Sequence, residues 1–94
     1  MMNQQSTSPL VSIALCTYNG AVFLRRQLDT ILQQTYTHLE IVIVDDASTD
    51  DTIQIIKTYA QQDDRIRFFQ NETNFGFNKN LEKNGYDHLL QHIL

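Results

Sequence analysis

Two short polar runs in this 94-residue chain carry the side chains best suited to bind a ligand. The first run is Thr17-Tyr18-Asn19, and the second is Asp45-Asp46. The ring of Tyr18 offers a face on which a nucleobase can stack, an interaction worth about 1–3 kcal/mol. The carboxylate of Asp46 can accept a hydrogen bond from an imide N–H such as that of uracil or thymine. Both groups could therefore contact a nucleobase, provided that the fold brings the two runs together.

Each of these residues also has a structural interpretation. Asp45 and Asp46 could simply precede a helix and favour its positive end, and Asp50 and Asp51 fit the role of acids in a first helical turn. Tyr18 could be an aromatic residue packed in a turn. These alternatives stay open for each residue alone, and the order of the motifs along the chain is what favours binding.

Other ligand motifs are weak or missing. Neither a glycine-rich dinucleotide fingerprint nor a P-loop occurs, so two common phosphate cradles are absent from the sequence. His88 and His92 stand four residues apart and could present two metal ligands on one helical face, but no third ligand stands in a suitable position. A solvated helix face is the better interpretation, and no metal site is predicted.

The apolar residues predict the elements that must position the two polar runs. LVSIALC and LEIVIV are apolar runs of strand length bounded by turn formers, whereas Leu24, Leu28 and Ile31 fall at helical spacing. Ser48, with Asp51 three residues later, resembles a capping box that opens a second helix. Strands are expected over 10–16, 39–44 and 65–69, and helices over 21–34, after residue 48 and from residue 77 onward.

This order, β-α-β-α-β-α, predicts right-handed crossovers and a Rossmann-like parallel sheet. Ligands of open parallel sheets bind outside the carboxyl ends of the strands. Thr17-Tyr18-Asn19 follows the first predicted strand and Asp45-Asp46 follows the second, so both should face one crevice. A phospho-receiver domain is also an α/β sheet, but its acidic pair follows the first strand and a further Asp follows the third. Here the third strand ends in Phe68-Phe69-Gln70, which argues against a receiver.

Composition limits the remaining possibilities. The chain is long enough for one domain, expected over residues 9–94 after a disordered lead over 1–8. A net charge of −4 argues against nucleic acid or an anionic membrane as partner. The single cysteine, Cys16, excludes an internal disulfide and fits a reducing compartment. No apolar run approaches the ~20 residues of a membrane span, so a cytoplasmic protein is expected.

Three blocks of the sequence closely resemble the family 2 glycosyltransferases, which have the GT-A fold. The first joins Val11-Ser12-Ile13 and Thr17-Tyr18-Asn19 to Leu24, Leu28 and the run ILQQTY over residues 31–36. The second is LEIVIVDDASTDDT over residues 39–52. The third, Asn74-Phe75-Gly76-Phe77-Asn78-Lys79-Asn80, is similar to the N-x-G loop of rhamnosyltransferase-like members. The blocks cover roughly residues 9–83.

The resemblance implies a nucleotide-diphospho-sugar donor, UDP- or dTDP-linked, bound at the carboxyl edge of the sheet. Tyr18 would stack on the base, Asp46 would bind its imide, and Asp45 would help to shape the site. Cys16 would lend mainly backbone contacts, and Lys79 or Asn80 would approach the diphosphate. The full set of residues implied in nucleotide binding is Cys16, Thr17, Tyr18, Asn19, Asp45, Asp46, Lys79 and Asn80.

The sequence also departs from the family. Members carry a D-x-D motif that holds Mg²⁺ or Mn²⁺ against the diphosphate, a later Asp or Glu that serves inverting members as catalytic base, and an acceptor-binding half. No D-x-D occurs in these 94 residues. The sequence is therefore expected to be a truncated, N-terminal half of a GT-A fold, without the metal ligands and without a catalytic residue. Such a chain alone should not transfer sugar to a glycan or lipid-linked acceptor.

The alternative is a non-catalytic module that retains the fold. It would keep the nucleotide site or would self-associate as a homo-oligomer through an exposed sheet edge or apolar face.

Overall fold

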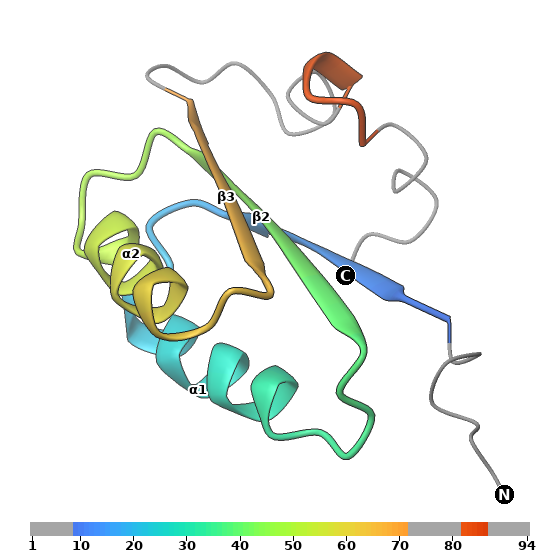
Figure 1. Ribbon diagram of the computed structural model, residues 1–94. Helices are drawn as coiled ribbons and strands as arrows, with labels where there is room; N and C mark the ends of the chain where they lie inside the picture. Colours follow the sequence, from blue (N-terminus) through green and yellow to red (C-terminus); the bar gives the residue numbers. More distant parts are fainter. Residues whose placement is uncertain (1–8, 72–81, 87–94) are drawn as a thin grey trace, which may run out of the picture.

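The computed structural model describes residues 9–71 and 82–86 (Figure 1). Strands and helices alternate along the chain, which confirms the predicted α/β fold. The elements are β1 (Val11–Thr17), α1 (Ala21–Leu32), β2 (Leu39–Asp46), α2 (Thr52–Gln62) and β3 (Ile66–Asn71). The predicted lead over 1–8 and most of the last predicted helix lie outside the described residues.

The three strands form a parallel sheet in the order β1-β2-β3. Each strand extends one or two residues beyond its predicted end, because the polar residues that follow the apolar run do not form turns. These residues continue the ladder instead: Thr17 pairs in register with Asp45, and Asp46 pairs with Asn71. The polar ends of the strands are therefore held by the sheet itself.

Both helices cover the same face of the sheet, which we call the helix face (Figure 1). In α1 the residues Leu24, Leu28 and Ile31 are buried, as their helical spacing predicted. They pack with Ile55 and Ile56 of α2 onto the sheet. Within the described part of the chain, neither helix is long and apolar enough to cross a membrane.

The other side of the sheet, which we call the opposite face, has a smaller apolar cluster. Ala14, Val42 and Val44 are completely buried there, with Phe69 and Tyr86 packed against them. The rings of Phe69 and Tyr86 lie 5.6 Å apart, centroid to centroid. The central strand β2 is thus buried on both faces, as its nearly unbroken apolar sequence predicted.

The predicted capping box at Ser48 is wrong. Helix α2 begins at Thr52, and its N-cap residue is Asp51, whose side chain makes no capping hydrogen bond. The Ser48 hydroxyl instead donates to Asp45, 2.5 Å away. In a capping box the serine oxygen would accept a hydrogen bond from a backbone N–H at the helix start. Here the hydroxyl donates to a buried carboxylate instead, because hydrogen bonds to a charged acceptor are stronger than bonds between neutral groups.

Helix α1 has one buried face and one exposed face, which gives a first prediction. Leu28→Ala should lower the free energy of unfolding by about 2–5 kcal/mol, because a completely buried leucine leaves a cavity. Val22→Ala, in the same helix at a position 86% exposed, is the matched control and should change it by less than about 0.5 kcal/mol. Urea unfolding followed by circular dichroism measures both. Equal losses would contradict the assignment of the buried face.

Candidate functional site

The pleat of β2 places its two terminal acids on different faces of the sheet. Successive residues of a strand point to opposite sides, so Asp45 and Asp46 cannot share one environment. Asp45 is 0% exposed and lies on the helix face, whereas Asp46 is half-buried on the opposite face. Asp45 and Asp46 are adjacent in the sequence but therefore belong to two different surroundings.

Asp45 is held by donors from two segments. The Thr17 hydroxyl at the end of β1 donates to Oδ1 over 2.6 Å. The Ser48 hydroxyl donates to the same oxygen over 2.5 Å, and the Ser48 backbone N–H donates to Oδ2 over 2.8 Å. A buried carboxylate needs such bonds, each worth about 1.5–3 kcal/mol, to offset its lost hydration. Asp45 therefore ties the end of β1 to the loop after β2, which suits the shaping role expected of it.

A second layer of bonds locks the loops after β1 and β2 together. The Asn19 N–H donates to the Ser48 hydroxyl over 2.8 Å, and the Asn19 Oδ1 accepts from the backbone N–H of Thr49, 2.8 Å, and of Asp50, 3.3 Å. Asn19 itself has a positive φ of 48°, a conformation that asparagine tolerates better than most residues. Its side-chain oxygen thus holds the loop after β2 in place, and a role of Asn19 in nucleotide binding stays a prediction.

Asp50 links the starts of both helices. Its carboxylate accepts from the backbone N–H of Ala21 over 3.2 Å and of Thr52 over 2.9 Å, and the Thr52 hydroxyl also donates to it. The bond from the Thr52 hydroxyl is the main cause that lowers the pKa of Asp50 below its ordinary value, and backbone donors add to it. The interpretation of Asp50 and Asp51 as acids in a first helical turn is wrong, because α2 begins at Thr52 and its first turn contains no acid. Asp50 lies outside both helices and bonds to the start of each.

The opposite face gathers different side chains at the same edge. Asp46 accepts a hydrogen bond from the Asn71 side-chain amide over 2.9 Å. Cys16, two residues beyond Ala14, faces the same side as Val44, its partner in register. Partial burial raises the pKa of the Cys16 thiol above its ordinary value, and the charges of Asp46 and Asp45 raise it further. Cys16 is exposed at the end of the strand, and a thiol whose pKa is raised stays neutral at pH 7 and is a weak nucleophile there.

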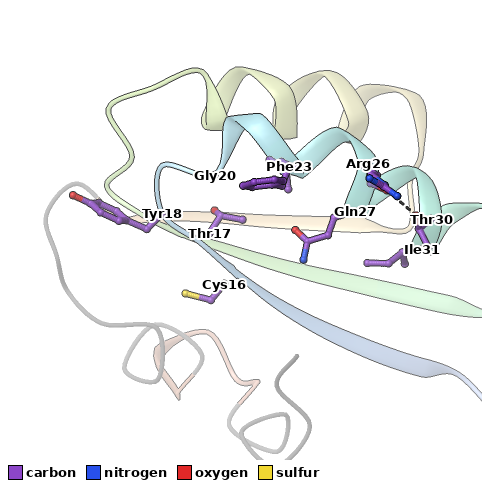
Figure 2. A pocket seen from close by; sticks show the side chains of 10 residues that line it. Cys16, Thr17, Tyr18, Gly20, Phe23, Arg26, Gln27, Thr30 and Ile31 are labelled. Atoms are coloured by element: carbon purple, nitrogen blue, oxygen red, sulfur yellow. Dashed lines mark hydrogen bonds between the residues drawn. The ribbon is translucent and has the colours of Figure 1, made fainter.

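Tyr18 stands just beyond the end of β1 with 57% of its surface exposed, so it is not a closely packed turn aromatic. Figure 2 shows its ring extending away from α1, with Thr17 and Cys16 on opposite sides of the strand. Tyr18 lines one end of a groove of about 680 Å³ that runs between β1 and α1, past Phe23 and Gln27. Asp46 does not line this groove. The strand ends, rather than the groove, bring the predicted residues together.

The structure thus brings six of the eight predicted site residues to one edge of the sheet. They are Cys16, Thr17, Tyr18, Asn19, Asp45 and Asp46. Lys79 and Asn80 lie outside the described residues. Ser48 and Asn71 also belong to this edge, and the sequence does not indicate either of them as part of the site. The position of Asn71 beside Asp46 follows only from the register of β2 and β3. A polar residue at the end of an apolar strand is nevertheless a sequence signal that could have indicated it as a site residue.

A divalent cation does not fit the described residues. Over 9–71 and 82–86, no three His, Cys, Asp or Glu side chains gather closely enough to hold one. Asp45 is already surrounded by three donors, and Asp46 faces an amide. His88 and His92 lie outside the described residues. No step of a reaction is therefore assigned to a metal bound by these residues.

The Asp45 network gives a prediction on stability. Asp45→Asn keeps the shape but replaces one acceptor oxygen by a donor, which then meets donors from Thr17 and Ser48. The free energy of unfolding should fall by about 1–3 kcal/mol. Asp51→Asn, an exposed acid without a side-chain capping bond, is the matched control and should change it little. Denaturant unfolding of both variants checks this, and equal small effects would contradict the proposed role of Asp45.

The surroundings of Cys16 give a prediction on reactivity. Because the Asp46 charge raises the pKa of the thiol, Asp46→Asn should lower that pKa and speed alkylation by iodoacetamide at pH 8. Asp64→Asn, an exposed acid before β3, should leave the rate unchanged. The alkylation rate against pH measures both. An unchanged rate in Asp46→Asn would show that the two side chains do not lie together.

Comparison with known proteins places this geometry in a family. The model of glycosyl transferase family 2 matches residues 12–83. An uncharacterized glycosyltransferase of Haemophilus influenzae is 37% identical over 73 residues, which are 78% of this chain and 23% of that protein. The putative glycosyltransferase EpsE of Bacillus subtilis is 41% identical over 70 residues, 73% of this chain and 25% of EpsE. The chain thus spans about a quarter of the length of these relatives.

Two solved structures share the fold. The mannosyltransferase PcManGT from Pyrobaculum calidifontis, in complex with GDP-Man and Mn²⁺, superposes with a TM-score of 0.67 at 29% identity, over 79% of this chain and 23% of PcManGT. TarS 1-349 of S. aureus, in complex with UDP, gives a TM-score of 0.61 at 32% identity, over 71% of this chain and 20% of TarS. The chain belongs to glycosyl transferase family 2, and its sheet is part of a GT-A fold.

Proposed function

We propose that this chain binds the nucleotide of a nucleotide-diphospho-sugar donor at the carboxyl edge of its sheet. The observation that supports this most is the separation of the acidic pair. Asp45 fixes the loops from inside, which leaves Asp46 on the opposite face near the end of β1, where Tyr18 is exposed. A stacking ring and a carboxylate acceptor on adjacent strand ends are the two groups that a nucleobase requires.

The chemistry of these groups favours a base with an N–H on its pairing edge. A carboxylate accepts from the imide of uracil or thymine, and it repels the ring-nitrogen acceptor of cytosine. Among pyrimidine nucleotides, the proposed donors are therefore UDP- or dTDP-linked sugars, as the resemblance also implies. The complexes of relatives support a nucleotide at this fold, since TarS is described with UDP and PcManGT with GDP-Man.

For a full-length protein of this family, the proposed reaction is transfer of a sugar from that donor to a glycan or lipid-linked acceptor. The proposed location is the cytoplasm. PcManGT is described with Mn²⁺, and we propose that Mg²⁺ or Mn²⁺ serves the donor diphosphate in this family. Among the described residues, no three His, Cys, Asp or Glu side chains gather to hold such an ion. The proposed contribution of this 94-residue chain is thus donor binding, and alone it should transfer no sugar at a measurable rate.

A second function rests on a different observation. In the described sheet β1 is an edge strand. Its first residue, Val11, is 42% exposed, and Leu10 just before the strand is 50% exposed. An edge strand with exposed apolar residues can pair with another chain. A self-associating module without nucleotide affinity is therefore the alternative, and it predicts a stable dimer that ignores nucleotides.

Amide NMR spectra of the labelled chain, titrated with UDP and dTDP in the presence of Mg²⁺, test the proposal. Tyr18→Ala should weaken UDP binding by roughly 5- to 150-fold through the loss of stacking. Asp46→Asn should weaken it by roughly 10- to 150-fold through the loss of a charged acceptor. Asp64→Asn, an equally conservative change at an exposed acid, should bind like the unaltered chain.

The two functions give opposite results. Shifts at the signals of residues 16–18 and 46 on addition of UDP, lost in the two site variants, support donor binding. Omitting Mg²⁺ should change the UDP affinity little, because the described residues do not hold the ion. A dispersed spectrum that ignores every nucleotide, with a dimer in analytical ultracentrifugation, would replace the proposal by the self-associating module.

A further inference from the structure

Asn71 is the last residue of β3, and neither the proposed stacking nor the proposed imide contact uses it. It pairs in register with Asp46 across the sheet, so both side chains leave the same face at the same height. The Asn71 amide nitrogen donates to Asp46 Oδ1 over 2.9 Å. Only 6% of Asn71 is exposed, which places this bond in a site partly shielded from water.

Such a bond determines how the carboxylate is oriented. The terminal torsion of an aspartate is broad, so an unrestrained carboxylate can rotate. A donor fixed on the neighbouring strand selects one orientation, and a buried amide on a strand pays little additional entropy to do so. An ionised carboxylate can accept about four hydrogen bonds, so a bond from Asn71 is compatible with a further bond from a ligand.

We propose that Asn71 is a positioning residue for base recognition. Its amide fixes the Asp46 carboxylate so that the acceptor meets a base with an N–H on its pairing edge and disfavours a base with a ring-nitrogen acceptor there. This inference rests on the proposed function and deepens it by naming the residue that sets base selectivity. The chemical class recognised is a uracil- or thymine-type nucleoside diphosphate, against a cytosine-type one.

A purely structural role for Asn71 would act differently. If Asn71 only completes the end of β3, its loss should loosen this end of the sheet and weaken the binding of every nucleotide to the same extent. A positioning role changes the ratio between bases, because only the imide-bearing base depends on the oriented carboxylate. The ratio of UDP to CDP affinity is therefore the informative readout, and the affinity for either one alone is not.

The experiment compares the 94-residue chain with Asn71→Ala and with Gln70→Ala, an exposed neighbour on the same strand that faces the other side. Dissociation constants for UDP and CDP come from NMR titration. The unaltered chain and Gln70→Ala should prefer UDP by the same factor. Asn71→Ala should lose roughly 2- to 12-fold in UDP affinity, the effect of one hydrogen bond, with CDP nearly unchanged.

Asn71→Asp covers the case in which Asn71→Ala does not fold. It keeps the shape and replaces the donating amide by an acceptor that faces Asp46, so it should reduce the preference for UDP at least as much. Equal weakening of UDP and CDP, or an unchanged ratio in a folded variant, overturns the role of Asn71 alone. Failure of the unaltered chain to bind UDP overturns the proposed function, and the inference falls with it.

Discussion

The interaction on which the rest of this structure depends is the burial of one carboxylate. Asp45 is 0% exposed and receives its donors from Thr17 and Ser48, not from a cation. An ionised group in such a place costs several kcal/mol unless every partner is in position. The end of β1 and the loop after β2 are therefore not independent. If one moves away, the charge of Asp45 is left unsatisfied, and the loops that carry Tyr18 and Asn19 lose their support.

This constraint explains why a half-exposed site can still be well ordered. Loops at the end of a sheet have few apolar contacts to fix them, and here polar bonds replace those contacts. The Asn19 side chain accepts hydrogen bonds from two backbone N–H groups of the loop after β2. The Asp50 carboxylate accepts one from a backbone N–H at the start of each helix. The positive φ at Asn19 and Ala47 is a local cost that these bonds offset. The order of the site thus comes from hydrogen bonds between sequence-distant loops.

The sequence predicts the elements well and the contacts at their ends poorly, for one physical reason. Periodicity reports burial, so the runs that became β1, β2 and the inner face of α1 were identified from apolar spacing alone. Periodicity stops where polar residues begin, and all three strands continue past that point. The partner of Asn71 depends on strand register, which no local pattern encodes, so the sequence does not indicate it. Ser48 lies only three residues from Asp45, but the sequence does not show that this carboxylate is buried, and the buried carboxylate binds the serine in place of the predicted capping box.

The proposed contacts to the base and the binding of a diphosphate-bound metal ion need different groups. The groups proposed to read the base lie on consecutive parallel strands, so two crossovers suffice to assemble them. A metal ion that neutralises a diphosphate needs its own ligands, and no three His, Cys, Asp or Glu side chains gather among the described residues to hold one. A sheet of this size can therefore encode selectivity for a base without encoding the transfer reaction. Affinity obtained this way comes from stacking and one directed hydrogen bond, both short-range, so it depends on the geometry of the strand ends rather than on the net charge of the protein.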